Sequence, residues 1–340
     1  MSNIKDEQRS RREGQAKGAY RICSLSPSFG LYSAEPVQKL KDKGWEVVPR
    51  PSDMSLDRDS VLEFFRDCDG VVPGMVKMDR AMMEALPRLK VIAVHGAGVD
   101  HIDLKGAEDL GIAVCNVPGG NARAVAELTL GLMLSLARRI PWADRLVKDG
   151  GWSTVMGCQL GGRALGIVGL GQIGKELARL AGCMGMKLQA HGRTQDREFT
   201  ERHGIAWLPL DDLLAASDFV SLHLPATPET MGLIQAPQLA LMRPGSFLLN
   251  LGRGGVVDEE ALLRSLEQGH LAGAALDVFA REPLGESPLA RLPQVISTPH
   301  MGGFTVESAA EVGRICAQNL AAVLEGQMPP HLVNRWAPPA

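Results

Sequence analysis

Short apolar runs alternate with helical segments in the N-terminal third of the chain. Residues 35–43 and 56–66 carry apolar side chains at the spacing of amphipathic helices. Five apolar runs around them are predicted to be strands: residues 21–25, 45–48, 70–72, 91–94 and 112–114. Because such alternation is typical of β-α-β units, we predict a small doubly wound domain with a parallel, flavodoxin-like sheet.

A second set of apolar runs occupies the rest of the chain. Six of them are predicted to be strands: residues 166–168, 186–190, 219–222, 247–251, 273–276 and 295–297. A complete Rossmann dinucleotide-binding domain has six parallel strands. The predicted fold class is therefore α/β, with two doubly wound parallel-sheet domains.

Two long helices are expected to connect these sheets. The first begins near Ala122 and runs toward Val147. Its apolar stretch at residues 128–137 is too short to cross a bilayer, so we predict a buried helix at a domain crossing. The second, over residues 305–324, has no strand partner of its own. We expect it to return and cover the first domain.

A glycine-rich turn follows the first strand of the second set. In the stretch from Gly166 to Gly174, Gly169 permits a tight turn, Gly171 lets the backbone approach a pyrophosphate, and Gly174 lets a helix pack on its strand. The N–H groups of Gln172 and Ile173 then begin a helix facing the phosphates. This pattern predicts a dinucleotide site.

The next predicted strand indicates which dinucleotide binds. An NAD-binding unit usually places an acid about 20 residues after the glycines to hold the ribose 2′-hydroxyl. Here the strand ends in His191, Gly192, Arg193 and Thr194, without an acid. Arg193 suits a 2′-phosphate and Thr194 adds a hydroxyl, so we prefer NADP over NAD as the cofactor. The alternative is that Arg193 is a solvated loop residue.

Composition narrows the class of protein. The chain of 340 residues is 45% hydrophobic, enough for about two domains. Its formal charge of −3 predicts no affinity for nucleic acid or for an anionic membrane. Six cysteines lie far apart without zinc-site spacing, so we expect no metal and reduced, buried thiols in a cytoplasmic protein. Residues 1–19 resemble no signal peptide and are expected to be a disordered tail.

Three polar groups follow three of the later strands. Arg253 follows residues 247–251, Asp277 and Glu282 follow residues 273–276, and His300 follows residues 295–297. The carboxyl ends of parallel strands open on the nucleotide crevice. Arg253 suits a substrate carboxylate, His300 suits proton transfer to a carbonyl oxygen, and Glu282 suits orientation of the imidazole. Together they predict reduction of a 2-keto acid, although each alone is more often structural.

The fourth strand of the first domain also ends in a glycine-bearing loop. This loop contains His95, Ala97 and Gly98. Its backbone amides suit a carboxylate, and a tight turn explains the glycines equally well.

These residues resemble the D-isomer-specific 2-hydroxyacid dehydrogenase family, in particular its glyoxylate and hydroxypyruvate reductase branch. The matching stretches are residues 95–103, 121–138, 166–174, 221–225 with Thr230, 250–261, 273–283 and 297–303. The resemblance covers nearly all of the chain from Tyr20 to Asn334. The departure from NAD-using members lies at residues 191–193.

The resemblance implies roles for individual residues. Arg253, Glu282 and His300 would be catalytic, while His95, Ala97 and Gly98, with Arg253 and His300, would contact the substrate. The implied cofactor contacts are Gly169, Gly171, Gln172, Ile173, Gly174, His191, Arg193, Thr194, Leu224, Pro225, Thr230, Leu251, Gly252 and Asp277, with Asn250 near the nicotinamide. The implied domains are a substrate-binding domain of residues 20–120 and 304–340 and a dinucleotide-binding domain of residues 121–303. A homodimer built on residues 121–147 is also implied.

Substrate choice stays open at this point. Glyoxylate and hydroxypyruvate are preferred, and selectivity is expected from Pro27, Ser28, Phe29, Met75 and His95. Phosphoglycerate, formate or phosphite dehydrogenation are alternatives on the same scaffold. A nucleotide-sensing, corepressor-like binding protein is the alternative from another class.

Overall fold

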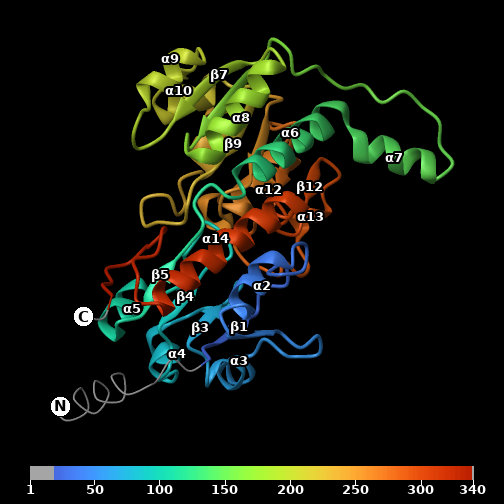
Figure 1. The fold of residues 1–340 in the computed structure, drawn as a ribbon. Helices are drawn as coiled ribbons and strands as arrows, with labels where there is room; N and C mark the ends of the chain where they lie inside the picture. The colour runs from blue at the N-terminus through green and yellow to red at the C-terminus, as the bar shows by residue number, and fades with distance from the viewer. Residues whose placement is uncertain (1–18, 339–340) are drawn as a thin grey trace. The chain divides into compact units, whose positions relative to one another are not determined.

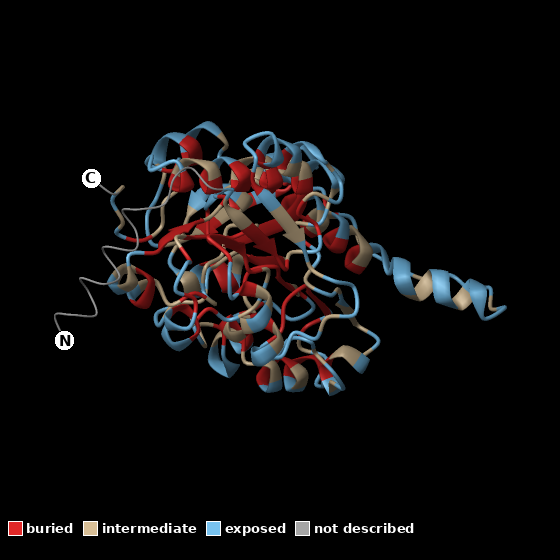
Figure 2. Ribbon diagram, turned by 60° about the horizontal axis from the view of Figure 1, so that its bottom comes forward, coloured by how far each residue is buried: buried red, intermediate tan, exposed pale blue. Residues whose placement is uncertain are grey.

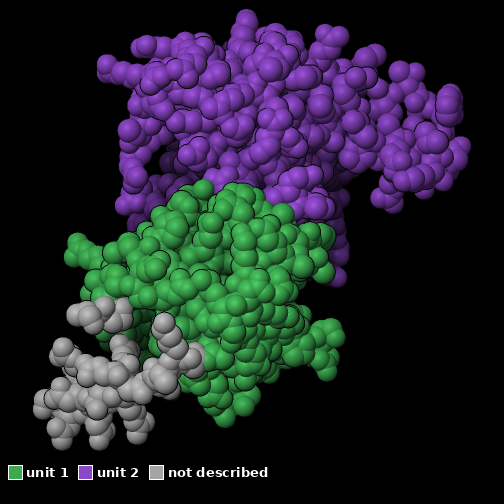
Figure 3. Space-filling model, viewed as in Figure 1, with its two compact units in different colours: residues 1–118, 309–340 green, residues 119–308 purple. Residues whose placement is uncertain are grey.

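A computed structural model describes residues 19–338. The expected disordered tail falls almost wholly on residues 1–18, outside the described residues. The chain divides into two compact units (Figure 3). Unit 1 contains the chain up to Pro118 and from Ala309 onward, and unit 2 contains Gly119–Ser308.

Unit 1 is built on a five-stranded parallel sheet in the order β2-β1-β3-β4-β5 (Figure 1). Its strands are β1 (Arg21–Ser24), β2 (Glu46–Pro49), β3 (Gly70–Val72), β4 (Val91–Ala93) and β5 (Ala113–Cys115). All five were predicted within a residue or two, and the order is that of a flavodoxin-like sheet. The prediction for this domain is confirmed.

The helices of unit 1 cover both faces of this sheet. They are α2 (Glu35–Lys41), α3 (Arg58–Phe65), α4 (Arg80–Glu84), α5 (Leu104–Leu110) and α14 (Val306–Leu324). Successive strand residues point to opposite faces, so Ile22 joins an apolar core that includes α14, whereas Cys23 joins a core with α3 and α4. The expected return of α14 to the first domain is confirmed by its buried Cys316 and Leu320.

The two short helices α4 and α5 were missed. Each spans seven residues or fewer, too short for a clear periodic pattern. Their sequence signal is a capping residue, because Asp79 accepts a hydrogen bond from the N–H of Met82, and Asp103 accepts one from that of Gly106.

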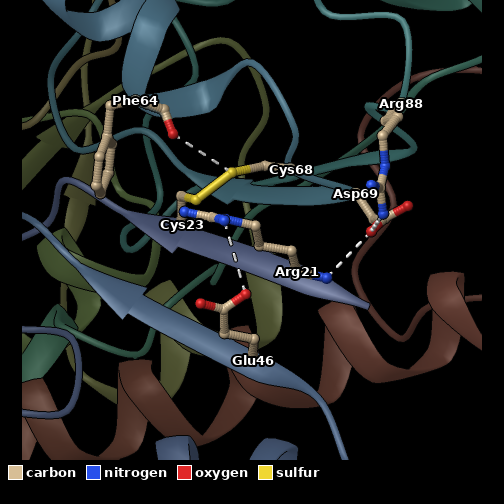
Figure 4. Close-up of a disulfide and its surroundings, with 7 residues drawn as sticks. All are labelled: Arg21, Cys23, Glu46, Phe64, Cys68, Asp69 and Arg88. Atoms are coloured by element: carbon tan, nitrogen blue, oxygen red, sulfur yellow. Dashed lines mark hydrogen bonds and ion pairs between the residues drawn. A yellow bond between two sulfur atoms is a disulfide. The ribbon is translucent and has the colours of Figure 1, made fainter. Parts of the chain in front are cut away.

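The expectation that every cysteine is a reduced thiol is wrong for Cys23 and Cys68. Their sulfur atoms are bonded across a sequence separation of 45 residues (Figure 4). Strand β1 pairs with β3 in parallel, with Cys23 opposite Val71, so the chain just before β3 comes beside β1. The spacing of the cysteines in the sequence did not indicate that Cys23 and Cys68 lie side by side. Cys115, Cys158, Cys183 and Cys316 are free thiols.

Unit 2 is built on a seven-stranded parallel sheet in the order β12-β11-β10-β9-β6-β7-β8. Its strands are β6 (Ala164–Val168), β7 (Lys187–His191), β8 (Ala206–Trp207), β9 (Phe219–Leu222), β10 (Phe247–Asn250), β11 (Gly273–Leu276) and β12 (Val295–Ser297). The six predicted strands are present. Strand β8 was missed because its two residues are too short for a pattern, and they join the sheet by pairing with β7.

Apolar cores fill both faces of this sheet, and Figure 2 shows buried strands, coloured red, at the centre of the molecule. Leu249 packs on one face with α6 and α8, and its neighbour Leu248 packs on the other with α10 to α12. The helices are α6 (Ala122–Arg138), α7 (Ile140–Lys148), α8 (Gln172–Cys183), α9 (Arg197–Arg202), α10 (Leu210–Ala216), α11 (Ala236–Leu241), a 3-10 turn (Gly254–Val256), α12 (Glu259–Glu267) and α13 (Pro288–Arg291).

The single long helix expected from Ala122 to Val147 is two helices. Arg139 separates α6 from α7 in a left-handed conformation with φ of 53°, and a proline follows in the first turn of α7. Proline cannot continue the hydrogen-bond ladder of a preceding helix. Helix α6 is largely buried, whereas α7 has no buried residue and projects from unit 2 (Figure 2).

No helix among the described residues is long and apolar enough to span a bilayer. Within residues 19–338, no group of three or more His, Cys, Asp and Glu side chains is arranged to hold a metal ion.

The packing of His95 makes the stability of unit 1 depend on pH. The ring lies against Phe29, with 5.8 Å between ring centroids, and its Nδ1 is 3.3 Å from the hydroxyl of Ser28. Burial lowers the pKa of His95 from 6.5 to about 4. The unfolded chain therefore binds a proton between these values that the folded chain does not.

We expect the free energy of unfolding to fall by about 2 kcal/mol between pH 7.5 and pH 5 because of His95. Urea unfolding of the wild type and of His95→Asn at both pH values measures this contribution. The variant should lose less stability on acidification. An equal pH dependence in both proteins would show that His95 does not titrate as its burial indicates.

Candidate functional site

The parallel sheet of unit 2 places its strand ends at one edge. Residues after β6, β7, β9, β10, β11 and β12 all follow the carboxyl ends of their strands. The chain runs outward from β6 to β8 and then restarts at β9 on the other side of β6. Open α/β sheets bind ligands at such a reversal of strand order. The candidate site therefore begins at the turn after β6.

The glycines of this turn are required by close packing. Gly169 has φ of 101°, and a Cβ there would lie 2.6 Å from the carbonyl oxygen of His223. A Cβ on Gly174 would lie 2.4 Å from the carbonyl oxygen of Gly169. The missing side chains let the turn fold tightly and let α8 pack directly on β6.

The middle glycine faces open space, as a dinucleotide site requires. A Cβ on Gly171 would meet no atom within 4 Å. Gly171 also precedes α8, whose first turn includes Gln172 and Ile173 and receives no side-chain cap. Free N–H groups at a helix start favour an anion, so these residues fit a pyrophosphate.

The residues at and after the end of β7 differ in their contacts. His191 ends the strand, and its Nδ1 lies 3.0 Å from the carbonyl oxygen of Leu208. Arg193 and Thr194 follow on an exposed loop. The first acid after them, Asp196, caps α9 and lies 2.6 Å from the ammonium group of Lys175. The carboxylate nearest in sequence to this strand end is therefore already bound to protein groups.

The loop after β9 is held by its own hydroxyl groups. Thr230 donates to the carbonyl oxygen of Pro225 at 2.5 Å and accepts from the N–H of Thr227 at 2.9 Å. Buried Leu251 and Gly252 follow β10, and a Cβ on Gly252 would lie 2.7 Å from the carbonyl oxygen of Leu224. These expected cofactor residues shape the edge of the site through backbone packing.

An imidazole and a carboxylate meet after β11 and β12. Nδ1 of His300 lies 2.7 Å from Oε2 of Glu282, and each side chain is about one-third exposed, 35% and 32% respectively. Oε1 of Glu282 accepts a hydrogen bond from the N–H of Phe279 at 2.9 Å. This bond fixes the carboxylate, which then fixes the ring, leaving Nε2 of His300 for proton transfer.

Asp277 anchors the turn that carries His300. Its carboxylate accepts hydrogen bonds from the hydroxyl of Thr298 at 2.6 Å and from the N–H groups of Met301 and Gly302 at 2.9 and 2.8 Å. The carbonyl oxygen of Asp277 also accepts from the N–H of His300 at 2.9 Å. These bonds hold His300 at φ of 52°, which is rare for a residue with a side chain. Sequence reasoning gave Asp277 a cofactor contact and missed this anchoring role.

Arg253 lies on a loop packed against the Glu282 loop. The side chain of Asn250 donates to the carbonyl oxygen of Arg253 at 2.9 Å and accepts from the N–H of Gly252 at 3.1 Å. A Cβ on Gly254 would lie 1.9 Å from the carbonyl carbon of Phe279. Only glycine allows this approach, so the three predicted catalytic residues come from loops that pack together within unit 2.

His223 is a residue of this edge to which sequence reasoning gave no role. It directly follows β9, and its Nε2 lies 2.9 Å from the hydroxyl of Ser221. Burial lowers the pKa of His223 to about 4, so the ring is neutral at pH 7. The rule that singled out Arg253 and His300, a polar residue just past a strand, also identifies His223.

The expected substrate residues of unit 1 follow β4. The carbonyl oxygen of Ala97 accepts a hydrogen bond from the side chain of Asn116 at 2.7 Å, and Gly98 follows on the same half-buried loop. Met75, after β3, is 69% exposed, whereas Ser28 and Phe29 are buried beside His95. Of the expected selectivity residues, Pro27 and Met75 are therefore the exposed ones.

Comparison with known proteins places these observations in a family. The model of the D-isomer specific 2-hydroxyacid dehydrogenase NAD binding domain matches residues 130–302. A glyoxylate reductase from Thermococcus litoralis is 39% identical over 307 residues, which cover 87% of this chain and 93% of the relative.

Solved structures agree with this match. The TT0316 protein from Thermus thermophilus is 37% identical with a TM-score of 0.85, covering 92% of this chain and 99% of that one. An NADPH-dependent glyoxylate/hydroxypyruvate reductase from Sinorhizobium meliloti, in complex with NADP and malonate, is 28% identical with a TM-score of 0.83 and covers 95% and 100%. The chain therefore belongs to the D-isomer specific 2-hydroxyacid dehydrogenase family and is a nicotinamide-dependent oxidoreductase.

Proposed function

We propose that this protein reduces a small 2-keto acid, preferably glyoxylate or hydroxypyruvate, to the D-2-hydroxy acid with NADPH. The observation that carries the proposal is the pair of His300 and Glu282, 2.7 Å apart, on loops that pack against the Arg253 loop. The glyoxylate reductase from Thermococcus litoralis, and the neighbouring structure with NADP and malonate, support this choice of substrate and cofactor.

Each group has one part in the reaction. A nicotinamide supplies the hydride that adds to the carbonyl carbon. Arg253 binds the substrate carboxylate through its planar fork of donors and polarises the neighbouring carbonyl. His300 gives its Nε2 proton to the carbonyl oxygen and recovers one from solvent, and in the reverse direction it accepts that proton. Glu282 holds the ring in place through Nδ1.

The two domains divide this work in our proposal. Residues 121–303 bind the dinucleotide, with the N–H groups at the start of α8 on the pyrophosphate and the loops after β7, β9 and β10 along the rest of the cofactor. Residues 20–120 and 304–340 bind the substrate, with the amides of Ala97 and Gly98 on its carboxylate. Asn250 and Asp277 would hold the nicotinamide end.

NADP is preferred over NAD because of the residues after β7. The strand ends without a free acid for a ribose 2′-hydroxyl, since Asp196 is paired with Lys175. Arg193 and Thr194 on the adjacent exposed loop supply donors for a 2′-phosphate. His191 contributes less, because its Nδ1 faces the carbonyl oxygen of Leu208.

A homodimer follows from the surface of the α7 segment. Helix α7 and the residues after it, which we call the arm (residues 140–157), expose Ile140, Val147, Trp152 and Met156 by 51% to 91%. Exposed apolar surface of this kind marks an interaction site. We propose that a second copy covers the arm, and that the protein acts in the cytoplasm, where NADPH is supplied.

The first experiment compares NADPH and NADH oxidation with glyoxylate, hydroxypyruvate, pyruvate and a bulky aromatic keto acid. We expect fastest turnover with NADPH and a small keto acid. Arg193→Ser should raise the KM for NADPH about tenfold and leave that for NADH unchanged, since one charge-assisted contact is lost.

Arg197→Ser, on the exposed start of α9, is the matched control. A wild-type preference for NADH would remove Arg193 from cofactor selection. Turnover of formate, phosphite or phosphoglycerate alone would replace the proposed substrate. Cofactor binding without any turnover would favour a nucleotide-sensing protein.

His300→Ala should lower keto acid reduction by about 10²- to 10⁴-fold, because the proton donor is lost. Cofactor affinity, measured by quenching of protein fluorescence, should stay near that of the wild type. His203→Ala, at the end of α9, changes a histidine outside the site and should leave both quantities unchanged. Near-normal turnover in His300→Ala would rule out the proposed acid.

The doubly substituted Val147→Asp, Trp152→Ser protein should sediment as a monomer, whereas the wild type should sediment as a dimer. A buried charge and a lost aromatic contact oppose association. Met184→Ser, which alters an exposed apolar residue at the end of α8, should remain dimeric. A wild-type monomer at micromolar concentration would contradict the proposed assembly.

A further inference from the structure

The turn that carries Glu282 is held by a second carboxylate, from Glu259. Oε1 of Glu259 accepts a hydrogen bond from the N–H of Ala280 at 2.6 Å. Glu259 is the first residue of α12, which begins shortly after Arg253 in the chain. The contact therefore ties this helix to the short turn between β11 and Glu282.

Adjacent N–H groups of this turn bind two different carboxylates. The N–H of Phe279 donates to Oε1 of Glu282 at 2.9 Å, and the N–H of the next residue, Ala280, donates to Glu259. The other oxygen of Glu282 lies 2.7 Å from Nδ1 of His300. A continuous series of contacts thus runs from Glu259 through the turn to Glu282 and His300.

The packing of this turn shows why such a contact is needed. On one side Phe279 is buried, and its backbone lies against Gly254, where a Cβ would approach within 1.9 Å. Ala280 is exposed and follows directly. Glu259 reaches this exposed end of the turn, so it restrains the peptide that the buried packing of Phe279 leaves at the surface.

We propose that Glu259 is a positioning residue for proton transfer, which keeps Glu282 directed at His300 by holding the N–H of Ala280. This inference rests on the proposed function, because it assigns Glu259 to the proton step of that reaction. Glu259 contacts neither substrate nor cofactor in this proposal. Its effect depends on the reach of the side chain to Ala280.

Two conservative substitutions of Glu259 separate the effect of side-chain length from the effect of charge. Glu259→Gln keeps the length and the acceptor oxygen but loses the charge. Glu259→Asp keeps the charge, which also suits the first turn of α12, but is one methylene too short to hold Ala280. If the length of the side chain is what matters, the Gln variant should reduce keto acids like the wild type, and the Asp variant should be slower.

The measurement is steady-state reduction of glyoxylate by NADPH across pH 5 to 9. For Glu259→Asp we expect kcat to fall about tenfold with both KM values within about twofold of the wild type. Glu259→Gln should restore kcat.

Glu260→Asp is the matched control, since its side chain is 87% exposed and lies 3.6 Å from Arg264 on the same helix. The proposal is overturned if Glu259→Asp behaves like Glu260→Asp, or if Glu259→Gln is as impaired as Glu259→Asp. It is also overturned if the Asp variant changes KM without changing kcat. A wild type that reduces no keto acid refutes the proposed function instead, which keeps the two failures distinguishable.

Discussion

The parallel direction of every strand in unit 2 is the constraint on which the candidate site depends. Seven strands side by side, all pointing the same way, bring their seven carboxyl ends to one edge although these are spread from Val168 to Ser297. Glycines then set how closely the loops on this edge approach each other. Gly254 lets the Arg253 loop lie on the backbone of Phe279, and Gly174 brings α8 onto β6.

Backbone N–H groups donate hydrogen bonds to the carboxylates at this edge. Asp277 accepts two of them and a hydroxyl, Glu282 accepts one, and Glu259 accepts another on the neighbouring residue. These hydrogen bonds fix the orientation of each carboxylate. Asp277 then orients His300 through the backbone, and Glu282 orients it through a direct contact with the ring.

The residues of the candidate site were predictable to different degrees. Arg253, Glu282 and His300 follow strong apolar strands, so the rule that parallel strands share one edge was enough to group them. The dinucleotide-binding turn could be predicted because each of its glycines meets a known steric requirement of such turns. Asp277 was found as a residue but not in its role, because its partners, Thr298, Met301 and Gly302, lie on a different loop. Glu259 was given no role for the same reason, since its partner is Ala280. His223 was overlooked although the rule of polar residues at strand ends identifies it.

The sequence by itself determined the α/β class, eleven of the twelve strands in residues 19–338, the dinucleotide turn and the three catalytic candidates. These features depend on local patterns of apolar residues, glycines and strand ends. Only the tertiary structure decided the pairing of β8, the bond between Cys23 and Cys68 and the hydrogen bonds of Asp277 and Glu259. Each of these depends on which segments become neighbours in the fold, and a local pattern carries no record of a neighbour that is distant in the chain.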